Sequence, residues 1–326
     1  MSEPSYALPL IDDTLFIDNS TLEVFTTCPR AAQYYVCQKK EKNTERPALR
    51  FGGIVHKILE TRYRRNDPCV TPECEAAMVA TAEAEFAQWT PPLEEFRNYG
   101  AAVNLIHEYN KHYPIEPFRP VMSGQTPLIE VPFACLLGEV PVMETILIRN
   151  PDGSIELRSV ETIKVMWQGR IDMVVQYEGR HYLVDHKTTS VMGPTYFREF
   201  EMSSQFHGYT WAAQKLLNTP IHGAIINAIG VRKPTRTGVP LEFERKTVQL
   251  SQTSLEEWER DTLYIVADFI EMVRRQYMPK HTKWCVGKYG MCQFFDVCTL
   301  PVEQRQQMLT TGEYKSVTWN PLSNQD

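Results

Sequence analysis

The chain turns from apolar to charged in the run Tyr182-Leu183-Val184-Asp185-His186-Lys187-Thr188-Thr189. The apolar residues predict a β-strand, and successive side chains of a strand point to opposite faces of its sheet. We therefore expect Asp185 and Lys187 on one face and His186 on the other. A carboxylate can hold a hard divalent cation, and an ammonium beside it can stabilise charge that develops on a phosphate. The pair suits metal-assisted hydrolysis of a phosphodiester, although an isolated Asp-x-Lys is more often a surface ion pair at a strand end.

A second carboxylate, Asp172, lies upstream in residues 167–177, which also read as a strand because β-branched and apolar residues are frequent there. Glu178-Gly179-Arg180 is a turn signal between the two runs. The pattern predicts an antiparallel hairpin with Asp172 and Asp185 toward the same end or on the same face of one sheet. Converging carboxylates repel each other unless a cation lies between them. The order Gly-x-x-Asp, hairpin, Asp-x-Lys is therefore much more specific than either carboxylate alone.

Two predicted helices supply further polar side chains. In residues 51–60 apolar residues recur at helical spacing, and His56 falls at the edge of the apolar arc. In residues 204–217, Gln205 and Tyr209 are four apart and share one face of the helix. A buried amide needs hydrogen-bond partners, which a substrate phosphate or base could supply. Singly, His56 is more often a hydrogen-bonded histidine of a helix, and Gln205 and Tyr209 more often make an ordinary hydrogen bond from helix to sheet.

Taken in order, four motifs resemble the RecB-like branch of the PD-(D/E)xK nuclease superfamily: His56, Gly169-Arg170-Ile171-Asp172, Asp185-His186-Lys187 and Gln205-x-x-x-Tyr209. The resemblance extends from about the first cysteine to the last, which is most of the chain. It implies an α/β fold with a restriction-endonuclease-like core, in which a central mixed β-sheet is flanked by helices.

The resemblance also implies the roles of these residues. The catalytic metal, Mg²⁺ or Mn²⁺, would be bound by the side chains of His56, Asp172 and Asp185 and by the backbone carbonyl of His186. Lys187 would be the catalytic lysine. The matches that would support DNA handling are Gln205 and Tyr209. Glu130, on an earlier predicted strand, matches an additional family glutamate, although one Glu on an alternating strand is usually solvent-facing.

The chain has eight cysteines, three of them crowded into residues 284–298: Cys28, Cys37, Cys69, Cys74, Cys135, Cys285, Cys292 and Cys298. The N-terminus has neither a basic start nor an apolar core, so we expect no signal peptide and a reducing, cytoplasmic location. Such a compartment favours metal binding over disulfides, and three clustered thiolates need a fourth ligand. Cys28 is the best candidate, because it precedes a proline, as a cluster cysteine often does, and follows Ser20-Thr21-Leu22-Glu23, a capping-box pattern.

One cysteine far upstream and three near the C-terminus resemble the iron–sulfur subset of RecB-like nucleases, which includes bacterial recombination nucleases, CRISPR adaptation nucleases and phage exonucleases. The resemblance implies a [4Fe-4S] cluster that ties the two ends of the nuclease domain together. The spacing between Cys285 and Cys292 is wider than the Cys-x-x-Cys common in that subset. Zinc is the alternative, because four-cysteine zinc sites tolerate varied spacing. The four remaining cysteines are expected to be buried free thiols.

Composition leaves a nucleic-acid-binding role open. The formal net charge of the 326 residues is −6, but affinity for a phosphate backbone depends on a local basic surface. Candidate basic segments are residues 39–50, 232–236 and 274–288, of which the first reads better as a solvated face. No apolar run is long enough to cross a bilayer, so no membrane association is expected. The chain has no Walker A sequence, so ATP-driven unwinding would need a partner.

We expect a single elaborated nuclease domain over residues 1–326, with an irregular segment before Ser20. Within it we distinguish an N-terminal helical segment with the first cluster cysteine, a helical insertion with the catalytic histidine, the nuclease core, a C-terminal helix with the cluster segment, and a polar tail: residues 20–50, 51–125, 126–250, 251–310 and 311–326.

The predicted function is that of a metal-dependent deoxyribonuclease, more an exonuclease than an endonuclease. Its expected substrate is DNA that is single-stranded or has a free end, in recombination, repair, phage DNA processing or CRISPR adaptation. A helicase, recombinase or integrase is the expected kind of partner. One alternative is a non-catalytic DNA-end-binding iron–sulfur module, but the intact set of His, Asp, Asp and Lys argues against it. The other alternative is a nuclease subunit that is active only within a larger complex.

Overall fold

The computed structural model describes residues 6–236, 240–287, 290–317 and 322. The chain divides into two compact units. Unit 1 comprises Met1–Thr44, Phe133–Gly169 and Glu256–Asp326, and unit 2 comprises Glu45–Pro132 and Arg170–Leu255. The organisation of the whole chain as one elaborated nuclease domain stays a prediction.

The sheet of unit 2 contains the predicted hairpin. Strand β8 (Ile155–Tyr177) enters this unit at Arg170 and pairs antiparallel with β9 (Arg180–Thr189), Met173 lying opposite Val184. The connecting residues Glu178 and Gly179 both have positive φ, 48° and 74°, as a tight two-residue hairpin turn requires. Beyond β9, the parallel strand β10 (Gly223–Val231) and the antiparallel strand β11 (Leu241–Gln249) extend the sheet. The sheet is therefore mixed, as predicted.

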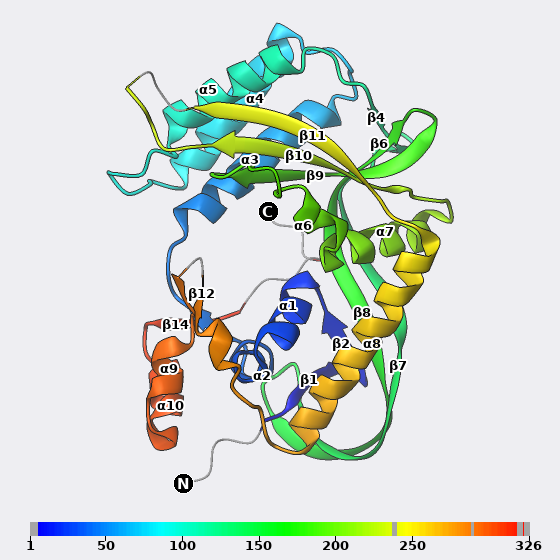
Figure 1. Cartoon of the computed structure of the whole chain (residues 1–326), viewed down its shortest axis with the longest axis vertical. Helices are drawn as coiled ribbons and strands as arrows, with labels where there is room; N and C mark the ends of the chain where they lie inside the picture. The colour runs from blue at the N-terminus through cyan, green and yellow to red at the C-terminus, as the bar shows by residue number, and fades with distance from the viewer. Residues whose placement is uncertain (1–5, 237–239, 288–289, 318–321, 323–326) are drawn as a thin grey trace. The chain divides into compact units, whose positions relative to one another are not determined.

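Helices cover both faces of this sheet (Figure 1). On one face lie α3 (Pro47–Arg64), α4 (Pro72–Ala87) and α5 (Tyr99–His112), which form a core with β9 and β10. On the other face lie α6 (Arg198–Glu201) and α7 (Ser204–Leu217). Gly52 lets α3 approach the sheet closely, since a Cβ there would lie 3.0 Å from Thr188 Oγ1. Three two-residue strands complete the unit: β4 (Arg119–Pro120), β5 (Met122–Ser123) and β6 (Thr126–Pro127).

Four strands pair in a ring in unit 1. Strands β1 (Leu8–Ile11) and β2 (Thr14–Ile17) form a hairpin; β2 pairs with β8, β1 pairs with β7 (Ile129–Arg149), and β7 pairs with β8. The expectation of an irregular segment before Ser20 was therefore wrong. Alternate residues of the hairpin are buried against the core, which is the pattern of a half-buried strand pair.

The rest of unit 1 is largely helical. The N-terminal part contains α1 (Asn19–Thr27), α2 (Pro29–Ala32), the π-helical turn η1 (Gln33–Cys37) and β3 (Lys40–Lys42). The long helix α8 (Gln252–Arg274) enters the unit at Glu256. After it come η2 (Thr282–Trp284), β12 (Val286–Gly287), β13 (Gly290–Met291), α9 (Phe295–Thr299), α10 (Val302–Leu309) and β14 (Tyr314–Ser316).

One detail of unit 1 differs from expectation, and a second concerns the polar tail. The N-cap of α1 is Asp18, whose carboxylate accepts the Thr21 N–H at 2.7 Å, and the pattern beginning at Ser20 lies inside the helix. The polar tail contains strand β14, which pairs antiparallel with β3 so that Tyr314 lies opposite Lys42. Within the described part of the chain, no helix is both long and apolar enough to span a membrane.

Candidate active site

Three potential metal ligands converge beside the β8–β9 hairpin. Asp172 stands on β8, one residue beyond the pair formed by Met173 and Val184. His56, on α3, places Nδ1 3.2 Å from Asp172 Oδ2. Glu130, at the start of β7, completes the group, and one ligand atom from each of the three residues lies within 4.8 Å of the other two. Imidazole and carboxylate donors in one group suit a divalent cation such as Mg²⁺ or Mn²⁺.

Glu130 joins this group through an unusual backbone conformation. Its φ is +52°, in the left-handed region that non-glycine residues rarely adopt, and its carbonyl accepts a hydrogen bond from Arg170 Nη1 at 3.2 Å. Burial, followed by the charge on Asp172, raises the pKa of the Glu130 carboxyl to about 7. The sequence matches Glu130 to an additional family glutamate but does not place it among the metal ligands, since a Glu on an alternating strand is usually solvent-facing; its left-handed backbone interrupts that alternation.

Asp185 and Lys187 form a second cluster on the face of β9 that carries α7. Lys187 Nζ lies 2.8 Å from Asp185 Oδ2. Gln205, in the first turn of α7, bridges the pair: its Nε2 donates to Asp185 Oδ1, and its Oε1 accepts from Lys187 Nζ, both at 3.1 Å. The carboxylate, ammonium and amide thus form a closed ring of contacts. Tyr209 lies one turn further along α7 and is half-buried, and its role in DNA handling stays a prediction.

Burial and neighbouring charges shift the pKa values of His56, Asp172 and Asp185. Burial would lower the pKa of His56, but the charge and hydrogen bond of Asp172 outweigh it and raise the pKa to about 9. Burial would raise the pKa of Asp172, but His56 holds it well below the ordinary value. Burial raises the pKa of Asp185 to about 6 against the opposing charge of Lys187. A cation that binds here would therefore displace protons, since ligands bind metals in their deprotonated forms.

His186 turns its side chain away from Asp185 and Lys187. Its ring is stacked on Tyr63, with centroids 5.6 Å apart and planes 8° from parallel, and Nδ1 lies 2.8 Å from Asn227 Nδ2. Its backbone N–H faces the site, donating to Asp172 Oδ2 at 2.9 Å. The proposed use of the His186 carbonyl as a metal ligand stays a prediction.

Three of the four candidate cluster cysteines belong to one small region of unit 1. Cys28 is buried at the break between α1 and α2 in a core with Phe294, and Cys292 and Cys298 pack against that core. Cys285 is tied to the same region, because its carbonyl accepts the Cys292 N–H at 2.9 Å. Among the described residues, however, the sulfur atoms do not form a group of three within 4.8 Å of one another. The iron–sulfur assignment is therefore treated below as a proposal.

A family model of the PD-(D/E)XK nuclease superfamily matches residues 19–299. The chain belongs to this superfamily. The matched residues contain both clusters of the candidate active site and the four candidate cluster cysteines, Cys28, Cys285, Cys292 and Cys298. As a PD-(D/E)XK nuclease the chain is a hydrolase of nucleic acid, and nucleases of this superfamily use divalent metals, for which the group of His56, Glu130 and Asp172 offers ligands.

The solved structures that resemble this PD-(D/E)XK nuclease share little sequence identity with it. One is the crystal structure of a candidate exonuclease from Eubacterium rectale, with 13% identity, coverage of 83% of this chain and 85% of that chain, and a TM-score of 0.46. Another is that of the protein SSO0001, with 11% identity, coverage of 78% and 79%, and a TM-score of 0.25. No curated protein matches the chain. The superfamily assignment rests on the family model alone.

Proposed function

We propose that this PD-(D/E)XK nuclease is a metal-dependent deoxyribonuclease of the RecB-like branch that digests single-stranded DNA from a free end. One observation carries the nuclease part of the proposal. Asp172, from the group with His56 and Glu130, and the pair of Asp185 and Lys187, from the ring with Gln205, stand on the two strands of one hairpin. Potential metal ligands and a charged catalytic pair are thus held together by β8 and β9.

The ligand set would be His56, Glu130, Asp172 and Asp185. A bound divalent cation would neutralise charge on the scissile phosphate and lower the pKa of the attacking water. Release of the His56 proton to solvent would free its imidazole nitrogen as a ligand and remove its ion pair with Asp172. The raised pKa of Glu130 means that this carboxyl would also give up a proton when it binds the cation near neutral pH.

Lys187 would orient the attacking water and stabilise the negative charge that develops on the phosphate in the transition state. Its ammonium contacts Asp185 and Gln205 and lies 5.6 Å from the ring centroid of Phe206. These contacts restrict a long side chain before substrate binds, which reduces the entropy that must be lost in the reaction. Gln205 would serve in the same step by holding the paired carboxylate and ammonium in their present orientation.

The preference for a single-stranded end rests on the resemblance of the motifs to RecB-like nucleases. The same resemblance suggests a cytoplasmic protein in recombination, repair, phage DNA processing or CRISPR adaptation, with a helicase, recombinase or integrase as partner.

We propose as well that Cys28, Cys285, Cys292 and Cys298 hold a [4Fe-4S] cluster, with zinc as the alternative occupant. Thiolates are the ligands that both prefer. Burial, and then the neighbouring thiol of Cys28, raise the pKa of Cys292, although the backbone N–H of Phe294 opposes them. Neighbouring thiols disfavour one another's ionisation, and a shared cation would relieve this repulsion between the thiolates.

Linear and circular single-stranded DNA together test the proposed activity. Protein purified without oxygen is incubated with Mn²⁺ and either a 5′- or a 3′-end-labelled linear strand, or a circular strand of the same sequence. We expect the linear strand to be degraded and the circle, which has no end, to persist. Cleavage of the circle at a comparable rate would replace the exonuclease with an endonuclease. No cleavage of either would refute the proposed function.

A further inference from the structure

One row of polar side chains crosses the sheet of unit 2. His186 on β9 is the register partner of Asn227 on β10, and Asn227 is the register partner of Arg245 on β11. The three side chains lie on the face that carries α3 and α5, opposite to Lys187. Asn227 is fully buried, and the side chain of Arg245 is 11% exposed. A buried guanidinium is costly unless it is paired, so its presence in this row calls for an explanation.

Arg245 fixes the orientation of the Asn227 amide. Its Nε lies 3.0 Å from Asn227 Oδ1, and a guanidinium can only donate, so the amide oxygen faces Arg245. The amide nitrogen therefore faces the other way, 2.8 Å from His186 Nδ1 and 2.8 Å from the Tyr109 hydroxyl. Since this nitrogen donates, Nδ1 of His186 must accept, and the ring proton of neutral His186 lies on Nε2.

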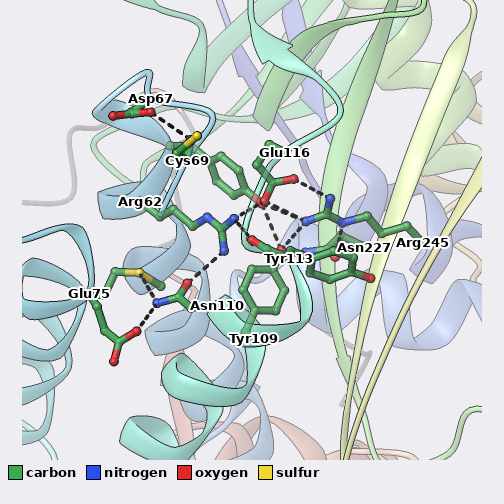
Figure 2. Close-up of polar contacts among 12 residues, drawn as sticks. Arg62, Asp67, Cys69, Glu75, Tyr109, Asn110, Tyr113, Glu116, Asn227 and Arg245 are labelled. Carbon is green, nitrogen blue, oxygen red and sulfur yellow. Dashed lines mark hydrogen bonds and ion pairs between the residues drawn. The ribbon is translucent and has the colours of Figure 1, made fainter. Parts of the chain in front are cut away.

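A buried network holds Arg245 in place (Figure 2). Its Nη1 lies 2.5 Å from Glu116 Oε2, and its guanidinium lies 3.6 Å from the ring centroid of Tyr113. Glu116 also accepts from Arg62 Nη2 at 2.6 Å and from the Tyr63 hydroxyl at 2.9 Å. Each polar group in the network is thus satisfied by its neighbours. A fully connected buried network of this kind favours one arrangement of its side chains.

The other end of the row contacts two proposed metal ligands. The backbone N–H of His186 donates to Asp172 Oδ2 at 2.9 Å. The ring of His186 meets that of His56 edge to face, with centroids 5.7 Å apart and planes at 84°. The position of His186 therefore limits how the His56 imidazole can turn and where the Asp172 carboxylate can lie.

We propose that Arg245 and Asn227 are positioning residues of the active site, which act through His186 on His56 and Asp172. The inference rests on the proposed function, because it assigns these two ligands to a catalytic cation. The effect of Arg245 and Asn227 on His56 and Asp172 passes through the ring and the backbone of His186. Partners that orient metal ligands in this way typically change metal affinity or activity by 10- to 100-fold when they are replaced.

The substitution Asn227→Asp tests the proposal without changing the size of the side chain. One carboxylate oxygen can still accept from Arg245 Nε, but the other cannot donate to His186 Nδ1. His186 must then move its proton to Nδ1, gain a second proton or turn. The matched control is Asn110→Asp. Asn110 is also buried, with 5% exposure, belongs to the same network and bridges Arg62 Nη1 at 2.9 Å and Glu75 Oε2 at 3.1 Å. The same charge enters there without touching His186.

The first measurement is the ¹⁵N spectrum of histidine-labelled protein without added metal. We expect the wild type to show an unprotonated Nδ1 at His186, Asn227→Asp to show a protonated one, and Asn110→Asp to match the wild type. The second is calorimetric titration with Mn²⁺ alone, for which Asn227→Asp should weaken the affinity by about tenfold or more and Asn110→Asp should change it little. On single-stranded DNA, Asn227→Asp should lower kcat with little change in KM.

Wild-type Mn²⁺ affinity in Asn227→Asp would overturn the proposal, as would an equal loss of affinity in both variants, which would mean general destabilisation. If Asn227→Asp does not fold, Arg245→Lys replaces it, since a lysine keeps the charge but removes the Nε donor. Its Mn²⁺ affinity must then fall relative to Asn110→Asp. Wild-type protein that cleaves no DNA would refute the proposed function, whereas the spectrum and the Mn²⁺ titration would still decide whether Asn227 positions the ligands.

Discussion

Nδ1 of His56 lies 3.2 Å from Oδ2 of Asp172, so two residues proposed to bind the same cation form an ion pair with each other. This pair makes metal binding compete with protonation. The pKa of His56 is raised to about 9 and that of Glu130 to about 7. Both groups bind a cation only after they lose a proton, so affinity must increase as the pH rises.

We therefore expect the affinity for Mn²⁺ to rise from pH 6 to pH 8, with protons released on binding. Calorimetry in two buffers of different ionisation enthalpy measures the number of protons. In His56→Ala the release at pH 8 should fall by about one proton, because this group is still largely protonated there. A proton release that is unchanged in His56→Ala would contradict the assignment of His56 as a ligand.

Gln205→Ala should slow cleavage and leave most of the metal affinity. Lys187 and Asp185 already form an ion pair, and the amide contacts both partners, so its removal takes away a restraint on the orientation of the pair. Single-turnover rates on labelled single-stranded DNA and Mn²⁺ titration separate the two effects. A loss of Mn²⁺ affinity as large as that in Asp172→Ala would mean that Gln205 acts on the metal site and not in DNA handling.

The hairpin and its residues could be predicted because their signals are local. Strand alternation places Asp185 and Lys187 on one face and His186 on the other, and a two-residue turn fixes the register that brings Asp172 close. Glu130 could not be placed, because its left-handed backbone breaks the alternation.

The row formed by His186, Asn227 and Arg245 was also beyond prediction. It depends on the register of three strands that are far apart in the sequence. The strands that precede Ser20 could not be predicted for a similar reason, since they are stabilised by pairing with β7 and β8 more than a hundred residues away.

His186 should make the protein less stable in acid. Its pKa is about 6.5 in the unfolded chain, and burial lowers it to about 3 in the folded protein. Between these values the unfolded state binds more protons, so the free energy of unfolding falls as the pH falls through this window. We expect His186→Phe, which keeps a ring against Tyr63, to lose less stability than the wild type between pH 7 and pH 5.

Urea unfolding at the two pH values measures this difference. Other groups also titrate in this window, so the comparison of wild type with variant isolates the contribution of His186. The control is His107→Gln, at an exposed histidine, which should follow the wild type. An equal fall in stability for the wild type and His186→Phe would show that His186 is not buried in neutral form.

Cys28→Ser should destabilise the protein as a whole if the four terminal cysteines share a cluster. Ligation would close a loop from Cys28 to Cys285, which restricts the unfolded chain, and cluster binding is coupled to folding. Cys69, which was expected to be buried, is exposed and offers a matched control, and Cys69→Ser should leave the melting temperature nearly unchanged. Protein purified without oxygen should contain iron and acid-labile sulfide.

Stoichiometric zinc without sulfide would replace the iron–sulfur assignment and keep the structural role of the four cysteines. Protein without either metal, in which Cys28→Ser melts at the wild-type temperature, would remove both.

The most direct test is the cleavage of end-labelled single-stranded DNA with Mn²⁺ by the wild type and by Asp172→Ala, Asp185→Ala and Lys187→Ala. Each substitution removes a charge required in the transition state, and one such contact is worth roughly 3 kcal/mol, or about a hundredfold in rate. Asp261→Ala, at an exposed carboxylate of α8, is the control. We predict that the wild type and the control cleave, that chelation of Mn²⁺ stops them, and that the three variants are inactive although folded. Cleavage by Asp185→Ala at the wild-type rate would contradict the proposed active site.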